Sequence, residues 1–283
     1  MPSQAAATGI RGARQLFQEE ERYHELAREH RPAYEAALPF PHVVLDDFLP
    51  VEVCEGLLEE FPEPSRIDWM RVERHHSKKL ATRGDGQFGK HTRFVMQQLN
   101  GAAFLEFLET LTGITGLIPD PYFEGGGLHQ IQDGGYLKVH ADFNWNKKLS
   151  LDRRINFILY LNKDWREEYH GHLELWDRSM TRCVRKVLPI YNRCVIFNTT
   201  SWSYHGHPEK LACPPGRTRK SLALYYYSNG RPEGERGEKH GTLWQERPPS
   251  GRYRGLVGNA LRASASVVEA PGRWLRSLAN RLG

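Results

Sequence analysis

His140 and Asp142 lie two residues apart at the end of the predicted strand YLKVHADF. Side chains at positions i and i+2 point to the same face of a β-strand, so an imidazole and a carboxylate are presented together. These groups form two corners of a facial metal site, and a second histidine would complete a 2-His-1-carboxylate set with positions left open for substrate and oxygen. The HxD tripeptide alone is weak evidence for a metal site, because a surface histidine beside an acidic residue is common.

Two downstream histidines, His205 and His207, are candidates for the third ligand. They follow a very apolar run at 194–197, which predicts a buried strand. Such a strand would run through the core and place the residues after it at the open end of the fold. A near copy of the YHGH tetrapeptide at 169–172 precedes another strand, where a turn with a glycine pivot is the better interpretation. The tetrapeptide itself therefore does not specify a ligand, and both histidines remain candidates.

Arg219 and Ser221 open the strand RKSLALYYY and share one face of it, whereas Lys220 lies on the other face. A guanidinium beside a hydroxyl is a good receptor for a carboxylate, which arginine binds in bidentate geometry. An arginine at the start of an apolar strand is most often a solvated end residue. However, Arg219 shares a face with Ser221 and lies one strand after a candidate metal-binding histidine. This position favours a carboxylate receptor over a solvated end residue.

These side chains require a β-fold to position them. Short β-type runs separated by turn residues are expected at 127–132, 136–143, 155–162, 172–177, 185–190, 193–198, 202–206 and 219–227. About eight short strands without intervening helices predict a sandwich or jelly roll. Helices expected at 10–37, 51–61 and 98–113 would buttress one face, and the polar stretch 72–92 is expected to be a surface loop or lid.

The order of the motifs GGYLKVHAD, INFILYLNKDW, HGHLELWD, RCVIFNTTSWSYHGHP and RTRKSLALYYY resembles the prolyl-hydroxylase-like branch of the iron(II)/2-oxoglutarate oxygenases. The resemblance covers about residues 120–230 and, more loosely, the segment 41–50. It implies a mainly β fold with flanking helices, in which a double-stranded β-helix (jelly roll) core is buttressed by N-terminal helices.

The resemblance also implies roles for individual residues. His140, Asp142 and His205 take the places of the catalytic iron(II) ligands, and His207 falls at a variable position. The interval from His205 to the next arginines is a few residues longer than is common, which keeps Arg217 as a weaker alternative to Arg219.

The cosubstrate implied by the resemblance is 2-oxoglutarate. Arg219 would bind its far carboxylate with Ser221 beside it, and Tyr160 matches a tyrosine that hydrogen-bonds the same carboxylate in relatives. Some collagen-type relatives use a lysine instead, but Lys220 points to the wrong face for that role.

The implied activity is that of a dioxygenase that consumes O2, hydroxylates an unactivated C–H bond and releases succinate and CO2. A peptide, amino acid, sugar or other small metabolite would be the substrate, and ascorbate is allowed as a reductant. Asp142 favours hydroxylation, because related halogenases replace this carboxylate with a small residue. The alternative is a non-catalytic β-sandwich binding module of the same fold. Missing ligands would indicate it, and all of them are present.

The net charge of +5 comes from the C-terminal segment, which contains ten basic and five acidic residues from Arg231 onward. The first 230 residues are neutral overall, so no nucleic-acid partner is expected. We expect an N-terminal helical segment at 1–40, an oxygenase domain at 41–230 and a basic tail at 231–283 that contributes little to the core. Residues 271–283 predict an amphipathic helix, for which self-association or packing is favoured over peripheral membrane contact.

The remaining features favour a cytoplasmic protein. Four cysteines show no CxxC spacing, the N-terminal residues have no apolar signal region, and no apolar run is long enough to span a membrane.

Overall fold

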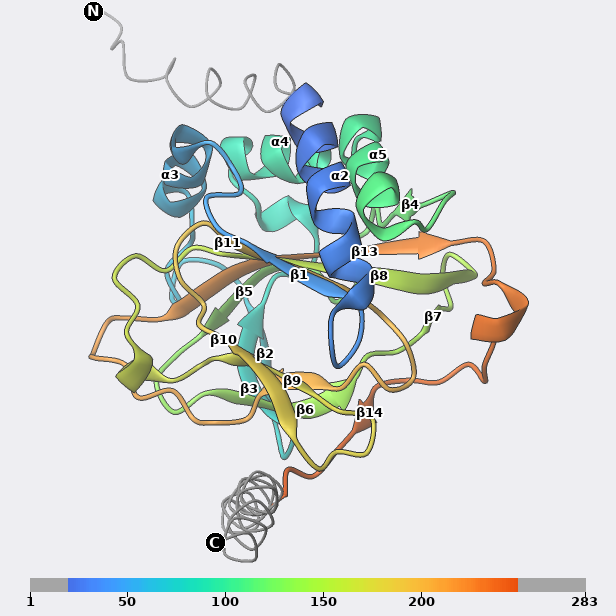
Figure 1. The fold of residues 1–283 in the computed structure, drawn as a ribbon. Helices are drawn as coiled ribbons and strands as arrows, with labels where there is room; N and C mark the ends of the chain where they lie inside the picture. Colours follow the sequence, from blue (N-terminus) through green and yellow to red (C-terminus); the bar gives the residue numbers. More distant parts are fainter. Residues whose placement is uncertain (1–19, 249–283) are drawn as a thin grey trace, which may run out of the picture. The chain divides into compact units, whose positions relative to one another are not determined.

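The helices of the computed structural model, which describes residues 20–248, lie on one side of a large sheet (Figure 1). They are α2 (Glu20–Ala36), α3 (Val51–Glu59), α4 (Lys90–Gln98) and α5 (Ala102–Thr112). The start of the helix predicted at 10–37 lies outside the described residues. The helix predicted at 98–113 corresponds to α5, which begins a few residues later because Gly101 adopts extended angles (φ −82°, ψ 166°) at its start. The preceding helix, α4, was not predicted.

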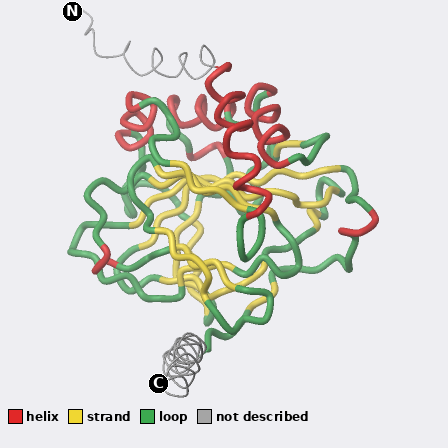
Figure 2. Tube along the Cα trace, viewed as in Figure 1, coloured by secondary structure: helices red, strands yellow, loops and turns green. Residues whose placement is uncertain are grey.

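The strands form one continuous, nearly closed antiparallel sheet (Figure 2). They are β1 (His42–Leu45), β2 (Met70–Arg74), β3 (Ser77–Ala81), β4 (Ile118–Pro119), β5 (Gly127–Ile131), β6 (Tyr136–Ala141), β7 (Trp145–Asn146), β8 (Leu151–Tyr160), β9 (Leu173–Trp176), β10 (Cys183–Val187), β11 (Arg193–Asn198), β12 (His205–His207), β13 (Arg219–Ser228) and β14 (Leu243–Trp244). The order along the sheet is β1-β11-β8-β13-β5-β3-β6-β12-β9-β10. The predicted jelly-roll core with helical support is confirmed.

Alternation along residues 155–160 of β8 separates the two faces of the large sheet. Ile155, Phe157 and Leu159 pack into the core beneath the helices, whereas Asn156 and Tyr160 line a cavity on the opposite face. The ring of Phe157 lies 5.7 Å from Phe48 and 5.4 Å from Phe104, measured between ring centroids. The helical layer therefore anchors one face of the strand and leaves the other face free to build a site.

The polar stretch predicted as a surface loop or lid contains the hairpin β2–β3, so that prediction is wrong. β3 pairs with β5 through Leu80 and Ala81 and with β6 through Ser77 and Lys78. It therefore joins the two halves of the sheet and places part of the polar stretch on the cavity wall.

Part of the segment assigned to the basic tail also packs against the sheet. In β14, Leu243 pairs with Ala141 and Trp244 pairs with His140 on β6. The Trp244 ring stacks on the His76 ring at 4.5 Å between centroids with an interplanar angle of 11°. The sheet thus extends past residue 230, whereas the amphipathic helix predicted at 271–283 lies outside the described residues.

A chain that ends after Pro232 should be less stable than one that ends after Pro248, because it lacks β14 and the hydrogen bond from the Asn144 amide nitrogen to the Glu238 carbonyl oxygen. We expect a loss of roughly 2–4 kcal/mol in the free energy of unfolding, from several hydrogen bonds and one packed indole. Urea unfolding of the two truncated chains measures this difference. Equal unfolding free energies would show that β14 contributes nothing.

Candidate metal centre

Two neighbouring strands bring the candidate ligands together. His205 on β12 pairs directly with His140 on β6, and their ring centroids are 4.6 Å apart. Asp142 follows the end of β6, with Oδ1 at 3.5 Å from Nε2 of His140 and Oδ2 at 3.4 Å from Nε2 of His205. One ligand atom from each residue lies within 4.8 Å of the others. This arrangement was predicted from the HxD spacing and the position of the downstream histidine.

Both imidazoles are held in the tautomer that a metal ligand needs. Nδ1 of His140 donates to the carbonyl oxygen of Lys138, and Nδ1 of His205 donates to that of Ser203, each at 2.9 Å. A carbonyl oxygen can only accept, so Nδ1 carries the proton and Nε2 presents its lone pair. The two lone pairs and the Asp142 carboxylate therefore converge on one point.

The Asp142 carboxylate is fixed by two further side chains that the sequence analysis missed. Its Oδ2 accepts hydrogen bonds from Nη2 of Arg153 at 2.9 Å and from Nδ2 of Asn156 at 2.7 Å. The guanidinium of Arg153 lies 3.5 Å from the ring centroid of Tyr225. Since both donors use Oδ2, Oδ1 remains as the oxygen that can bind a metal ion.

Electrostatics keep these ligands in their metal-binding protonation states. Burial alone would raise the pKa of Asp142, but the charge of Arg153 and the two nearby histidines outweigh it and hold this pKa well below its usual range. Burial lowers the pKa of His205 to about 4. At neutral pH the set thus includes the Asp142 carboxylate and the neutral imidazole of His205, which suits a divalent transition metal such as iron(II).

The metal ligands line a cavity of about 240 Å³ that also contains the predicted cosubstrate residues. Arg219 is buried, and its Nε donates to the carbonyl oxygen of Gly171 at 2.8 Å while Nη2 donates to the Tyr160 hydroxyl at 3.3 Å. Ser221 lines the same wall. Among residues 20–248, no carboxylate forms an ion pair with Arg219, so this buried guanidinium is available to an anionic ligand.

The structure separates the alternatives that the sequence left open. The ring of His207 lines the cavity but is not part of the cluster of candidate ligand atoms. Arg217 points away from the cavity and donates to the carbonyl oxygens of Lys163 and Asp164. Lys220 likewise lies off the cavity wall. The geometry thus favours His205 over His207 and Arg219 over Arg217.

A comparison with protein-family models identifies residues 126–227 as matching the 2OG-Fe(II) oxygenase superfamily. This segment is therefore similar to that superfamily. It contains the three candidate metal ligands together with Tyr160, Arg219 and Ser221. The resemblance found in the sequence is confirmed, as are iron(II) and 2-oxoglutarate as the cofactor and cosubstrate of the oxygenase.

Solved structures with a similar fold include a prolyl-4-hydroxylase from Pseudomonas putida, with a TM-score of 0.50 and 16% identity over 72% of this chain and 100% of that chain. HygX from Streptomyces hygroscopicus, crystallised with nickel, 2-oxoglutarate and hygromycin B, has a TM-score of 0.50 and 11% identity over 76% of this chain and 96% of that chain. At these identities the likeness shows the fold alone. No curated protein sequence matches this chain.

Replacing His205 with Ala should abolish stoichiometric iron(II) binding, because one of the three converging ligand atoms is removed. His207→Ala should keep about one iron per chain, since its ring lies outside the cluster. Elemental analysis of anaerobically reconstituted proteins measures both contents. Loss of iron in His207→Ala but not in His205→Ala would reverse the choice of ligand.

Stability of the metal-free oxygenase should fall as the pH drops from about 6.5 toward 4. His205 has a folded pKa of about 4 but titrates near 6.5 in the unfolded chain, so the unfolded state binds more protons in this window. Each such buried histidine contributes a slope of up to about 1.4 kcal/mol per pH unit. Asp142, with its lowered pKa, loses its contribution only below about pH 3.8.

Urea unfolding of the metal-free protein across this pH range measures the slope. A His205→Gln variant, which cannot titrate there, should show a shallower dependence. Identical slopes for the two proteins would contradict the assignment of a neutral buried imidazole.

Proposed function

We propose that His140, Asp142 and His205 bind iron(II), and that Arg219 binds the far carboxylate of 2-oxoglutarate with Tyr160 and Ser221 beside it. The observation that supports this most directly is that one cavity contains two receptors. One is the set of three converging ligand atoms, and the other is the buried guanidinium of Arg219, with which no carboxylate of residues 20–248 forms an ion pair. Binding of 2-oxoglutarate requires both receptors, because the metal chelates one end of the dicarboxylate and the arginine binds the other end.

When bound, iron(II) and 2-oxoglutarate supply oxygen activation coupled to decarboxylation, which leads to hydroxylation of an unactivated C–H bond and release of succinate and CO2. The protein's own groups orient and isolate this chemistry. Arg153 and Asn156 hold Asp142 through Oδ2, so the carboxylate offers a single oxygen in a fixed direction. Apolar side chains on the cavity wall, including Ile158 and Leu173, limit the access of water. The carboxylate at position 142 favours hydroxylation over halogenation.

The substrate is proposed to be a small molecule or a peptide group, because the cavity of about 240 Å³ is below the usual size of drug-sized ligand sites. Turnover of 2-oxoglutarate in the presence of candidate substrates, followed by product mass, tests the activity. A protein that binds neither iron(II) nor 2-oxoglutarate would instead support the non-catalytic binding module.

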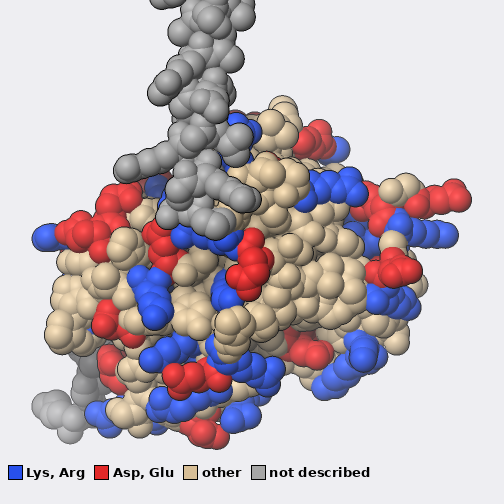
Figure 3. All heavy atoms as spheres, turned by 90° about the horizontal axis from the view of Figure 1, so that it is seen from below, with Lys and Arg blue, Asp and Glu red and all other residues tan. Residues whose placement is uncertain are grey.

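Other partners receive less support. On the face drawn in Figure 3, lysine and arginine side chains are interspersed with aspartate and glutamate, which does not favour a nucleic-acid surface there. Within residues 20–248, no helix is both long enough and apolar enough to cross a membrane. We place the protein in the cytoplasm, where the unpaired thiols of Cys54 and Cys194 suit a reducing compartment.

An Arg219→Gln variant should bind 2-oxoglutarate roughly 30- to 1000-fold more weakly, because removing one partner of a buried charge-assisted pair costs on the order of 2–4 kcal/mol. Arg217→Gln is the matched control, since Arg217 points away from the cavity, and its affinity should stay near that of the wild type. Calorimetric titration of 2-oxoglutarate into the metal-loaded proteins measures both. An unchanged affinity in Arg219→Gln would exclude this arginine as the receptor.

A further inference from the structure

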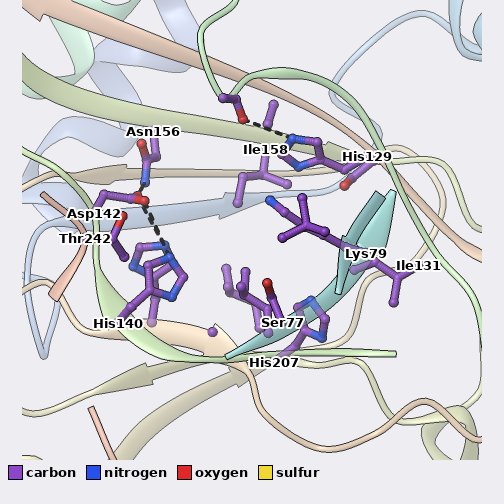
Figure 4. Close-up of a pocket in the computed structure, with 18 of the residues that line it drawn as sticks. Ser77, Lys79, His129, Ile131, His140, Asp142, Asn156, Ile158, His207 and Thr242 are labelled. Carbon is purple, nitrogen blue, oxygen red and sulfur yellow. Dashed lines mark hydrogen bonds and ion pairs between the residues drawn. The ribbon is translucent and has the colours of Figure 1, made fainter. Parts of the chain in front are cut away.

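β3 places a second cation on the cavity wall, in addition to Arg219. Ser77 and Lys79 line the cavity, whereas Lys78, between them in sequence, is exposed on the opposite face and lies 3.8 Å from Glu73. β3 is held in this position by β2 along one edge and, along the other edge, by β6 at Ser77 and Lys78 and by β5 at Leu80 and Ala81. Figure 4 shows the Lys79 side chain pointing into the cavity from the side opposite His140 and Asp142. The ammonium and the metal centre therefore face the same space.

The Lys79 ammonium has no anionic partner within residues 20–248. It forms no ion pair and no hydrogen bond there, although burial lowers its pKa to about 8. At neutral pH it is still mostly protonated. A partly buried ammonium without an anionic partner is unfavourable, so its position on a cavity wall is typical of a ligand-binding group.

The cavity lining carries an excess of positive charge that the two carboxylates of 2-oxoglutarate do not neutralise. Three cationic side chains, Lys79, Arg153 and Arg219, line the cavity together with one carboxylate, that of Asp142. Arg153 is already paired with Asp142 at 2.9 Å. In the proposed function, one carboxylate of 2-oxoglutarate binds Arg219 and the other binds the dipositive metal ion. Lys79 then remains as the cation to which neither residues 20–248 nor the cosubstrate supplies an anion.

A second observation at the same wall is the ring of His207, which is only 3% exposed and has no hydrogen-bond partner at either nitrogen. Leu137 on β6 pairs with Ser77 on one side and with His207 on the other. Ser77 and His207 therefore flank the same residue, and both line the cavity (Figure 4). A hydroxyl and an imidazole N–H are suitable donors to a carboxylate oxygen.

We propose that Lys79, with Ser77 and His207 as hydrogen-bond donors, binds a carboxylate of the primary substrate. The substrate is then a small carboxylic acid, such as an amino acid or an N-acylated amino acid, that is hydroxylated close to its carboxylate because the cavity is small. Lys79 supplies a single positive charge with two hydrogen-bond donors beside it, and this set suits a carboxylate. This inference rests on the proposed function, which assigns Arg219 to the cosubstrate.

The experiment compares each L-amino acid and N-acetyl-L-amino acid with its own carboxamide. Each probe is titrated by calorimetry into the full-length protein loaded with nickel(II) and 2-oxoglutarate, so that no turnover occurs. In the wild type, at least one acid should bind about 10- to 100-fold more tightly than its amide, as expected for a charge-assisted hydrogen bond.

Lys79→Met should abolish the preference for acid over amide, and Lys79→Arg should retain part of it. Lys78→Met is the matched control, because it removes the neighbouring charge on the exposed face, and it should retain the full preference. Melting temperatures of the three variants confirm that each protein is folded.

Three results would overturn the inference: no acid preferred over its amide in the wild type, a preference that persists in Lys79→Met, or tighter binding of inorganic phosphate than of every acid. Affinity for 2-oxoglutarate is measured first, without any probe. If Lys79→Met weakens it as much as Arg219→Gln does, Lys79 serves the cosubstrate and the inference also fails. Absence of 2-oxoglutarate binding in the wild type is a separate result, which rejects the proposed function itself.

Discussion

The close approach of β12 to β6 is the constraint on which the candidate metal centre depends. Between His205 and His207 lies Gly206, where a Cβ atom would stand 2.7 Å from the carbonyl oxygen of Lys138 and 2.9 Å from that of Leu137. Any side chain at this position would push the two strands apart. Since His205 pairs directly with His140, such a displacement would separate two of the three ligand atoms by the same amount. Backbone contact therefore sets the ligand spacing before any side-chain interaction does.

The large sheet supplies rigidity to the site through its other face. On β13, Leu222, Leu224 and Tyr226 belong to the core beneath the helices, while Arg219 and Ser221 face the cavity. Apolar burial on one face fixes the register, because a slip of one residue would exchange the two faces. The guanidinium is thus positioned by the packing of its apolar neighbours, and the helices contribute to the cavity without lining it.

The sequence pattern predicted which side chains share a face wherever the strand is regular. His140, Arg219 and Ser221 lie on strands and Asp142 directly follows β6, so the i, i+2 spacing predicted that each pair shares a face, and both pairs line the cavity. The sequence analysis did not identify Arg153 and Asn156 as partners of Asp142. They are three residues apart and would therefore occupy opposite faces of a regular strand. A register shift in the pairing of β8 with β13, where Tyr226 faces Ile155 and Tyr227 faces Arg153, leaves Arg154 as an extra residue. That bulge brings both side chains to the Asp142 carboxylate.

Two short strands were missed for a different reason. β3 has only five residues, two of them lysines, and its strand character comes from pairing on both edges rather than from apolar alternation. β14 has two residues within a polar segment, and its place is set by pairing with β6 and by the stacking of Trp244 on His76. Such tertiary pairing overrides local composition, and no single-sequence pattern reports it.

The position of β14 in the chain also sets an order of assembly during synthesis. The ligands His140, Asp142 and His205 leave the ribosome before Trp244, whose ring comes to rest 5.0 Å from that of His140. At about 5–20 residues per second, the 39 residues from Gly206 to Trp244 take roughly 2–8 s to be made. For that interval the nascent chain can present its three ligands while the wall beside His140 is still open. The wall is completed only when β14, the last strand within residues 20–248, pairs with β6.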